Sequence, residues 1–330
     1  IVMYTLPLAD IQAAQARIAG YIRHTPIAPL PPLNEDLPRT LRLKLENLQV
    51  VGSFKPRGVF NTLLQLSPEA RQRGVIAASG GNHGVALAYG AWRLGIPATV
   101  YLPESATDDR KARIGVWGAR LVQHGSVWDE AHEEAVRHAE REGLTYVHPF
   151  DSDATLAGQG TLGLEIIADL PEVDCVLIAI GGGGLIAGAA AALKALRPGM
   201  RIIGVEPVGA PSMLESVRAQ ALRPLDSVNT IADTLSPRSV SSRTLDLTRQ
   251  FVDDIVLVSD SAMIAAMRWL WLHMNQLVEP SGAAVIAALR TGAVDIGSFA
   301  CPVAVICGGN AAAEPVFTAY EAQARAKGSL

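Results

Sequence analysis

The chain has 330 residues, of which 49 % are hydrophobic and only 18 % charged, and its formal net charge at pH 7 is −4. This composition predicts a compact globular protein and excludes a disordered or fibrous chain. No long basic run is present, so nucleic acid and anionic membranes are excluded as partners and we expect a small molecule instead. Three cysteines, Cys175, Cys301 and Cys307, lie in or beside apolar stretches, as expected for reduced thiols in the cytoplasm.

Short apolar runs that favour strands alternate with helical patterns along the chain. In chain order, the expected strand and helix pairs are 74–78 with 85–94, 98–102 with 108–117, 120–124 with 128–142, and 175–180 with 185–197, followed by strands at 201–205 and 303–307. Such alternation is typical of parallel βαβ units in which helices cover both faces of a sheet. The sequence therefore predicts an α/β fold.

Three stretches need a separate interpretation. Residues 175–193 carry no charge and are long enough to span a membrane. Four glycines at 181–184 interrupt them, so we expect a strand, a turn and a helix instead. Residues 210–246, with their prolines, serines and arginines, are predicted to be irregular surface structure or a lid, and residues 311–330 to be one terminal helix.

Lys55 lies in the segment SFKPRG at 53–58, which offers few polar partners for an ordinary surface lysine. A desolvated lysine beside another cation, here Arg57, loses its proton near neutrality and can attack a carbonyl group. An aldehyde cofactor is the obvious carbonyl. On this segment alone, a lysine that begins a helix and points at water is the simpler interpretation, and the remaining motifs decide between the two.

Three strands are followed by polar or glycine-rich turns. The turns are SGGNHG at 79–84, GGGGL at 181–185 and CGGN at 307–310. In open parallel sheets such turns meet at the carboxyl ends of the strands, where ligands bind, so the three turns predict one site. The four glycines before a helix leave backbone N–H groups uncovered at the positive end of the helix dipole, which predicts a phosphate site.

The turn at 79–84 has the features of a carboxylate site. The helix that follows it would bind a carboxylate through its first N–H groups and the Ser79 hydroxyl. Capping of that helix by Ser79 or Asn82 is the alternative, and the two roles are compatible.

The glycine loop also fits a dinucleotide. The spacing Gly182-x-Gly184-x-x-Ala187, followed by a strand and Glu206, matches the fingerprint of NAD-binding oxidoreductases. This class is the rival prediction, although it leaves Lys55 and the two GGN turns unexplained. A Walker-type nucleotide site is excluded, because no lysine followed by serine or threonine comes after the glycines.

Taken together, the motifs resemble the serine/threonine dehydratase family, a group of pyridoxal 5'-phosphate (PLP) enzymes of fold type II that includes threonine ammonia-lyases and serine racemases. The matching motifs are SFKPRG at 53–58, SGGNHG at 79–84, GQGTLGLEI at 158–166, GGGGLIAG at 181–188, EPSGA at 279–283 and CGGN at 307–310. The resemblance implies the tryptophan synthase β-like fold, with two open parallel-sheet domains and the active site between them. Residues 1–73 and 149–330 would form a large PLP-binding domain, and residues 74–148 a small mobile domain.

The resemblance also implies roles for individual residues. Lys55 would hold the cofactor as a Schiff base and act as the catalytic base, while Phe54 stacks on the ring and Asn82 bonds its hydroxyl. The full set of implied cofactor contacts is Phe54, Lys55, Asn82, Gly181, Gly182, Gly183, Gly184, Leu185, Glu279 and Cys307. Cys307 would be a neutral partner of the pyridine nitrogen, which favours elimination over transamination. The implied substrate contacts are Ser79, Gly80, Asn82 and His83.

The implied reaction is α,β-elimination from L-threonine or L-serine to 2-oxobutanoate or pyruvate plus ammonia. Racemases of the family carry a second serine where this chain has Gly80, so we expect dehydration without efficient racemisation. Serine racemase stays an alternative, as does a dehydratase of another β-hydroxy amino acid such as 3-hydroxyaspartate. The family also implies a homodimer.

A metal site is the last expectation from the resemblance. In metal-activated relatives, a glutamate at the position of Glu206 acts with the carbonyl group at Ala210 and with an acidic side chain where this chain has Ser212. One carboxylate with neutral oxygens is a weak magnesium or calcium site, because hard cations prefer more anionic oxygens.

Overall fold

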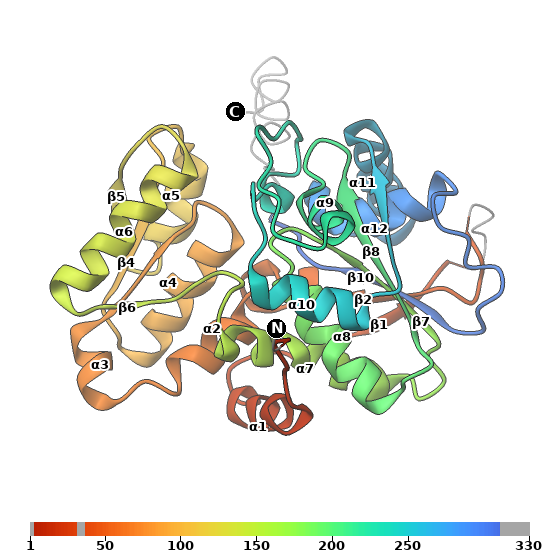
Figure 1. Ribbon diagram of the computed structural model, residues 1–330, viewed down its shortest axis with the longest axis horizontal. Coiled ribbons are helices and arrows are strands. Elements are labelled where there is room, and N and C mark those ends of the chain that lie inside the picture. Colours follow the sequence, from red (N-terminus) through yellow and green to blue (C-terminus); the bar gives the residue numbers. More distant parts are fainter. Residues whose placement is uncertain (1–2, 32–36, 311–330) are drawn as a thin grey trace, which may run out of the picture.

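In the computed structural model, which describes residues 3–31 and 37–310, two lobes each surround an open sheet (Figure 1). The larger sheet has the strand order β1-β2-β10-β7-β8-β9. These strands are β1 (Ile27–Pro29), β2 (Arg42–Leu45), β7 (Cys175–Ala179), β8 (Arg201–Pro207), β9 (Asp254–Val258) and β10 (Pro302–Ile306). Every neighbouring pair is parallel except β1 with β2.

The smaller sheet has the order β5-β4-β3-β6, and all of its pairs are parallel. Its strands are β3 (Val75–Ala78), β4 (Ala98–Leu102), β5 (Arg120–Gln123) and β6 (Thr145–Tyr146). The predicted α/β fold with two parallel-sheet domains is confirmed, with one antiparallel edge strand added. All four strands lie within 74–148, the stretch assigned to the small domain, and the mobility of that domain stays a prediction.

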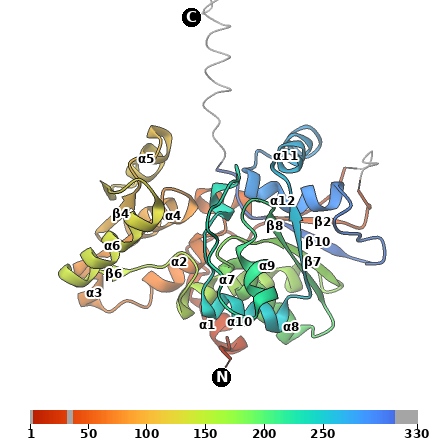
Figure 2. The ribbon, with the colours of Figure 1, turned by 45° about the horizontal axis from the view of Figure 1, so that its top comes forward.

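The helices cover both sheets. The larger lobe carries α1 (Leu8–Ile18), α2 (Pro56–Leu63), α7 (Asp153–Asp169), α8 (Gly184–Leu196), α9 (Ser212–Ala219), α10 (Ser242–Phe251), α11 (Asp260–Met274) and α12 (Pro280–Arg290). The smaller lobe carries α3 (Pro68–Arg73), α4 (Asn82–Leu94), α5 (Asp108–Gly115) and α6 (Trp128–Glu142). Three short 3-10 helices lie outside the smaller sheet: η1 (Glu46–Leu48), η2 (Val50–Gly52) and η3 (Asp233–Leu235). Helix α2 packs against α7 on one side and α4 on the other, so it joins the lobes (Figures 1 and 2).

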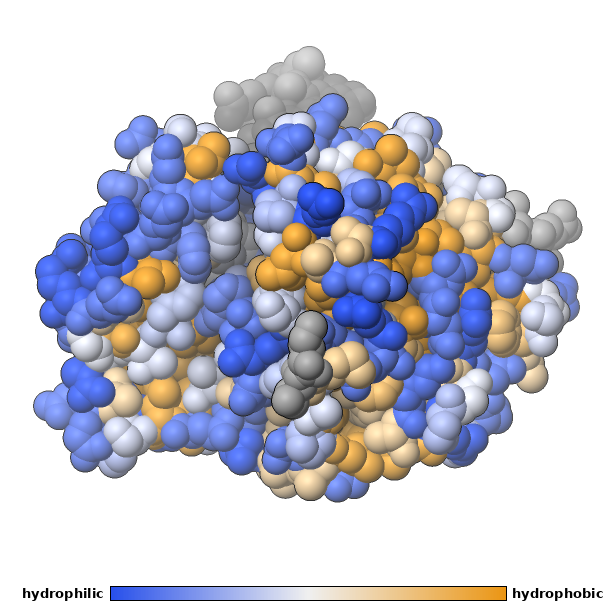
Figure 3. Space-filling model, in the orientation of Figure 1, coloured by the Kyte–Doolittle hydropathy of each residue, from blue (hydrophilic) through white to orange (hydrophobic). Residues whose placement is uncertain are grey.

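The apolar runs of the sequence form the sheet interior. Every residue of β7 and β10 is buried, as expected for strands covered on both faces. Hydrophilic side chains instead predominate over the smaller lobe, at the left of Figure 3, where α5 and α6 carry many charges. The stretch 175–193 forms β7, the glycine loop and part of α8, and within the described residues no helix is long and apolar enough to cross a membrane.

The prediction of irregular structure over 210–246 is partly wrong, because α9 lies inside this stretch and α10 begins there. The N-terminus of α10 is a capping box formed by Ser241 and Thr244. Helix α9 is capped from outside, because the carboxylate of Glu206 accepts hydrogen bonds from the backbone N–H groups of Met213 and Leu214. The helix predicted at 311–330 lies outside the described residues.

Candidate active site

Lys55 stands directly before α2, whose first residue is Pro56. Proline is suited to this position because the N–H that it lacks has no helical partner there. The Lys55 Nζ donates a hydrogen bond to the carbonyl oxygen of Pro149 (2.9 Å) and lies 5.0 Å from the ring centroid of Phe54. Burial lowers the pKa of Lys55 to about 8. The amine is therefore held by one neutral acceptor, and about a tenth of it is uncharged at pH 7, far more than of an ordinary lysine.

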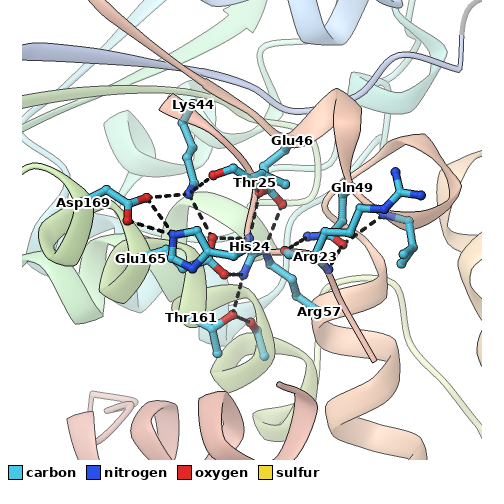
Figure 4. Close-up of polar contacts among 12 residues, drawn as sticks. Arg23, His24, Thr25, Lys44, Glu46, Gln49, Arg57, Thr161, Glu165 and Asp169 are labelled. Carbon is cyan, nitrogen blue, oxygen red and sulfur yellow. Dashed lines mark hydrogen bonds and ion pairs between the residues drawn. The ribbon is translucent and has the colours of Figure 1, made fainter. Parts of the chain in front are cut away.

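Burial, and not the charge of Arg57, is the main cause of this lowered pKa. Arg57 is fully buried and binds the carboxylates of Glu46 (2.8 Å) and Glu165 (2.7 Å), as Figure 4 shows. These two carboxylates balance the guanidinium charge. The expectation that Arg57 acts on Lys55 as a neighbouring cation is therefore wrong.

The buried network around Arg57 continues to a second cation (Figure 4). Lys44 Nζ lies 2.9 Å from a carboxylate oxygen of Glu165 and 3.2 Å from one of Asp169, and the more exposed His24 bonds Asp169 at 2.8 Å. Lys44 belongs to β2 and Glu165 to α7, so the network ties the larger sheet to the helices next to Lys55.

The glycine loop at 181–184 joins β7 to α8. Gly183 has φ +86°, a conformation that favours glycine, and no side chain caps the N-terminus of α8. The loop lines one cavity together with Phe54 and Lys55. Leu185 and Cys307 line it as well, and so do Phe150, Thr234 and Ser281. The first N–H groups of α8 are uncapped and lie at the positive end of its dipole. Together with Lys55 in the same cavity, they form an anion site.

Asn82, Glu279 and Ser281 form a buried polar cluster at the same cavity. The Asn82 Nδ2 and the Ser281 hydroxyl both donate hydrogen bonds to Glu279 Oε1, each at 2.6 Å. Burial raises the pKa of the Glu279 carboxyl above its usual range and raises the pKa of the Cys307 thiol to about 12. Cys307 is therefore a neutral thiol at the cavity wall.

A second cavity of about 350 Å³ adjoins the first, because Asn82, Thr234 and Glu279 line both. Its wall includes Gly80 and Gly81 from the smaller lobe, and Asp233 from the larger lobe. Arg110 and Arg113 of α5 also line it, with an ion pair from Arg110 to Asp233 and another from Arg113 to Asp109. The cavity thus lies between the lobes and has room for an amino acid beside the first cavity.

The structure divides the four predicted substrate contacts. Gly80 and Asn82 line the second cavity, whereas Ser79 and His83 line neither cavity. The Ser79 hydroxyl accepts a hydrogen bond from the N–H of Gly81 (3.3 Å), and His83 Nε2 lies 2.8 Å from the carbonyl oxygen of Val147. The ring of His83 is buried inside the smaller lobe. This burial lowers its pKa to about 3, so the ring is neutral.

Several residues of the two cavities carry no signal in the sequence. Phe150, Thr234, Arg110 and Asp233 belong to no motif, and only the fold brings them to the site. Ser281 is different, because it lies inside the EPSGA motif at 279–283 and that motif points to it.

Glu206 is fully buried at the end of β8, away from both cavities. Its two carboxylate oxygens accept the N–H groups of Met213 (2.8 Å) and Leu214 (2.9 Å), and burial raises its pKa to about 7. A ribose could not reach a carboxylate bonded in this way, so the dinucleotide interpretation loses its acidic residue. Within the described residues, no group of three or more histidine, cysteine or acidic side chains could hold a metal ion.

Comparison with known proteins decides the class. Residues 18–308 match the protein family described as pyridoxal-phosphate dependent enzyme. The chain belongs to this family. It is 38 % identical over 284 residues to the L-threonine ammonia-lyase of Thermotoga maritima, a match that covers 86 % of this chain and 71 % of the relative.

Two solved structures of the family are similar throughout. Maize serine racemase superposes with a TM-score of 0.93 at 31 % identity, covering 98 % of this chain and 99 % of that one. The processed form of threonine deaminase isoform 2 from Solanum lycopersicum superposes with a TM-score of 0.87 at 31 % identity, covering 97 % and 91 %. The fold of this chain is therefore the one of PLP-dependent fold type II enzymes, as predicted.

The residues of the first cavity fit PLP. The amine of Lys55, with its lowered pKa, suits the aldehyde, and the uncapped glycine loop suits the phosphate. The neutral Cys307 thiol lacks the charge that would hold a proton on the pyridine nitrogen, so it suits an uncharged ring. The NAD-binding alternative has no such match, because it explains neither Lys55 nor Cys307.

Proposed function

We propose that the chain catalyses PLP-dependent elimination from L-threonine or L-serine, with loss of the β-hydroxyl group and release of 2-oxobutanoate or pyruvate plus ammonia. The observation that carries the proposal is the Lys55 amine, which has a lowered pKa and lines the same cavity as the uncapped glycine loop. The relatives named L-threonine ammonia-lyase and threonine deaminase support the substrate class.

PLP, when bound, supplies the electron sink for the bond that breaks at the substrate Cα. Lys55 would hold the cofactor and then move the Cα proton, for which its pKa near 8 is suited. The glycine loop would orient the phosphate, while Phe54 and Asn82 would fix the ring. The neutral Cys307 thiol would limit proton uptake at the ring nitrogen, which favours elimination over transamination.

The second cavity favours a substrate with a neutral side chain. Its two arginines, Arg110 and Arg113, are each paired with a carboxylate, of Asp233 and Asp109 respectively. A substrate with a second carboxylate, such as 3-hydroxyaspartate, would have to displace one of these partners. The paired charges therefore support threonine or serine over an acidic substrate, and Gly80 supports elimination over racemisation.

The test is the visible absorption spectrum of the purified protein before and after adding L-threonine, with Lys55→Ala beside it. We expect a yellow protein whose band changes with threonine, and a missing or altered band in the variant. The reaction is then followed through 2-oxobutanoate and ammonia. A protein that stays colourless after PLP is supplied, or that is yellow but unchanged by threonine and serine, contradicts the proposal.

Three further features complete the proposal. A homodimer is the family expectation, and α11 exposes the apolar side chains of Ile264, Trp271 and Leu272, which a second copy could cover.

The three unbridged, buried cysteines support a reducing cytoplasmic compartment. A weak magnesium or calcium site at Glu206 and Ala210 requires the cation to displace two N–H donors, and unchanged activity and melting temperature on chelation would remove it.

A further inference from the structure

Asn310, the last residue of the turn after β10, links two parts of the active site that lie far apart in the sequence. Its Nδ2 donates hydrogen bonds to Asn82 Oδ1 (2.7 Å) and to the carbonyl oxygen of Val51 (2.9 Å). Asn82 begins α4 in the smaller lobe, and Val51 belongs to the loop that leads to Lys55. Asn310 also lines the cavity of about 350 Å³. The amide therefore contacts both lobes at the site itself.

The backbone at Val51 is strained. Its φ of 53° and ψ of 24° lie in the left-handed region, which a β-branched residue rarely adopts and which costs about 1–3 kcal/mol. The following Gly52 has φ +76°, and a Cβ there would lie 2.5 Å from Asn310 Oδ1. Val51 is strained, and Gly52 leaves room for the amide of Asn310. We infer that the loop is shaped to fit this side chain.

Backbone contacts hold this loop against the turn after β10. The N–H of Gly309 donates to the carbonyl oxygen of Gly52 (2.9 Å), and the N–H of Phe54 donates to that of Cys307 (3.1 Å). The loop that carries Lys55 and the turn that carries Asn310 therefore behave as one unit, and a bond from Asn310 to Asn82 fixes Asn82 relative to Lys55.

The bond from Asn310 also sets the orientation of the Asn82 amide. Because Asn82 Oδ1 is the acceptor, its Nδ2 must face the other way. There, one of the two Nδ2 hydrogen atoms is donated to Glu279 Oε1 at 2.6 Å. An Nδ2 group carries a second hydrogen, which remains for an acceptor in the cofactor cavity that Asn82 lines. In the reversed orientation an amide oxygen would face that cavity and the carboxylate oxygen of Glu279.

We propose that Asn310 is a positioning residue for cofactor binding. It holds the Asn82 amide so that Nδ2 donates to the oxygen of the hydroxyl group on the PLP ring. It also ties that donor to the loop of Lys55. This inference rests on the proposed contact between Asn82 and the cofactor ring, and it adds the residue that fixes the direction of that contact.

A double-mutant cycle tests the proposal through the dissociation constant of PLP, measured by titrating cofactor-stripped protein. The variants are Asn82→Ala, Asn310→Ala and the double variant. One lost hydrogen bond to a charged or polar acceptor corresponds to roughly a tenfold weaker affinity. We expect each single variant to weaken PLP binding about tenfold and the double variant to be no weaker than Asn82→Ala. The absorption maximum of bound PLP should shift in the same way in all three.

The outcomes separate the two levels of the proposal. If Asn82→Ala leaves the PLP affinity unchanged, the contact of Asn82 with the cofactor fails. If Asn82→Ala weakens binding but Asn310→Ala does not, only the role of Asn310 fails. Additive losses in the double variant also overturn it, because Asn310 would then act independently of Asn82.

Two further variants guard against a general loss of structure. Asn310→Asp keeps the size of the side chain but loses both donated bonds, so it should weaken PLP binding as Asn310→Ala does. Asn61→Ala is the matched control. Like Asn310, Asn61 donates to a backbone carbonyl oxygen, that of Ala154 (2.7 Å), and it accepts a hydrogen bond from Arg17, yet it lines neither cavity. Asn61→Ala should leave PLP affinity unchanged, and weakening equal to that of Asn310→Ala would contradict a specific role.

Discussion

The pKa of Lys55 is lowered because burial outweighs the opposing effect of the Glu279 carboxyl in the same cavity. Burial lowers the pKa of His83 to about 3 and that of His148 to about 4, so both nearby rings are neutral at neutral pH. The acceptor of the Lys55 amine is the carbonyl oxygen of Pro149, which is neutral as well. This environment stabilises an ammonium group far less than water does, which is the physical reason for its lowered pKa.

The first prediction concerns the rate at which cofactor-stripped protein takes up PLP. Only the neutral amine attacks an aldehyde, and with a pKa of about 8 it is protonated below that pH. We therefore expect the uptake rate to rise about tenfold per pH unit below pH 8 and to level off above it. Stopped-flow absorbance between pH 6 and 9.5 measures this rate. A rate that still rises tenfold per unit at pH 9.5 would mean that Lys55 titrates as an ordinary lysine.

Gly80 allows a second prediction, on the balance between elimination and racemisation. A Cβ at Gly80 would lie 3.4 Å from Leu102 and 3.9 Å from Arg110, which are ordinary contacts, so Gly80→Ser should fold. The variant restores the hydroxyl that racemases of the family carry there. We expect measurable conversion of L-serine to D-serine, detected by chiral chromatography, with elimination retained.

Gly80→Ala is the control for this change, because it adds the same Cβ without the hydroxyl. Equal D-serine formation by both variants, or none by Gly80→Ser, would show that the missing hydroxyl does not limit racemisation in this chain.

Single residues of the site were predictable where a motif names them. The amine of Lys55, the four glycines and Cys307 stand in short segments whose chemistry is local, and the structure brings them to one cavity. His83 stands in such a segment too, yet its ring turns to the carbonyl oxygen of Val147, a partner that only the tertiary fold supplies. Local sequence thus predicts which turn reaches the site better than it predicts where each side chain of that turn points.

At the scale of elements, the buried ion network fixes α2 to α7 behind Lys55. The guanidinium of Arg57 holds two carboxylates that have almost no contact with water, Glu46 being fully buried and Glu165 nearly so. The attachment matters for the site because Lys55 lies directly before α2. Removing the guanidinium while keeping both carboxylates leaves uncompensated negative charge in the interior.

The third prediction is that Arg57→Met lowers the free energy of unfolding by about 3–5 kcal/mol, as expected when one partner of a buried ion pair is lost. Urea unfolding followed by circular dichroism measures it. The matched control is Arg137→Met on α6, because the exposed Arg137 pairs with Glu133 and Glu134 at the surface and should cost less than about 1 kcal/mol. Equal losses in both variants would show that the network does not stabilise α2.

Contacts between residues far apart in the sequence explain why two elements, β2 and α9, were not predicted. The strands β7 and β10 are continuous apolar runs, and they lie within a residue or two of their predicted positions. The strand β2 was missed, because its Lys44 reads as a surface residue until Glu165 and Asp169, more than a hundred positions later, are brought against it. Helix α9 was missed for a similar reason, since its cap is Glu206 on another element.

For the whole molecule, residues of both lobes line each cavity, although Asn82 is the one residue of the smaller lobe that lines the first. Asn82 of the smaller lobe reaches Glu279 and Asn310 of the larger one, and Arg110 reaches Asp233. Outside the cavities, Arg238 of the larger lobe pairs with Asp129 of α6 at 3.3 Å. If the smaller lobe moves during turnover, as the family resemblance implies, these contacts favour its closed position.

The last prediction isolates closure from direct contact with the substrate. Asp129 lines neither cavity, so Asp129→Asn removes one bond between the lobes without changing the site. Because both partners are about half exposed, the pair contributes less than about 1 kcal/mol, and we expect KM for threonine to rise about 2–5-fold with kcat nearly unchanged. The difference in KM between the variant and the wild type should shrink at about 0.5 M salt, which screens exposed pairs.

Glu133→Gln is the control on the same helix, since Glu133 pairs with Arg137 of that helix. If Asp129→Asn matches Glu133→Gln in KM at every salt concentration, the pair does not hold the lobes closed.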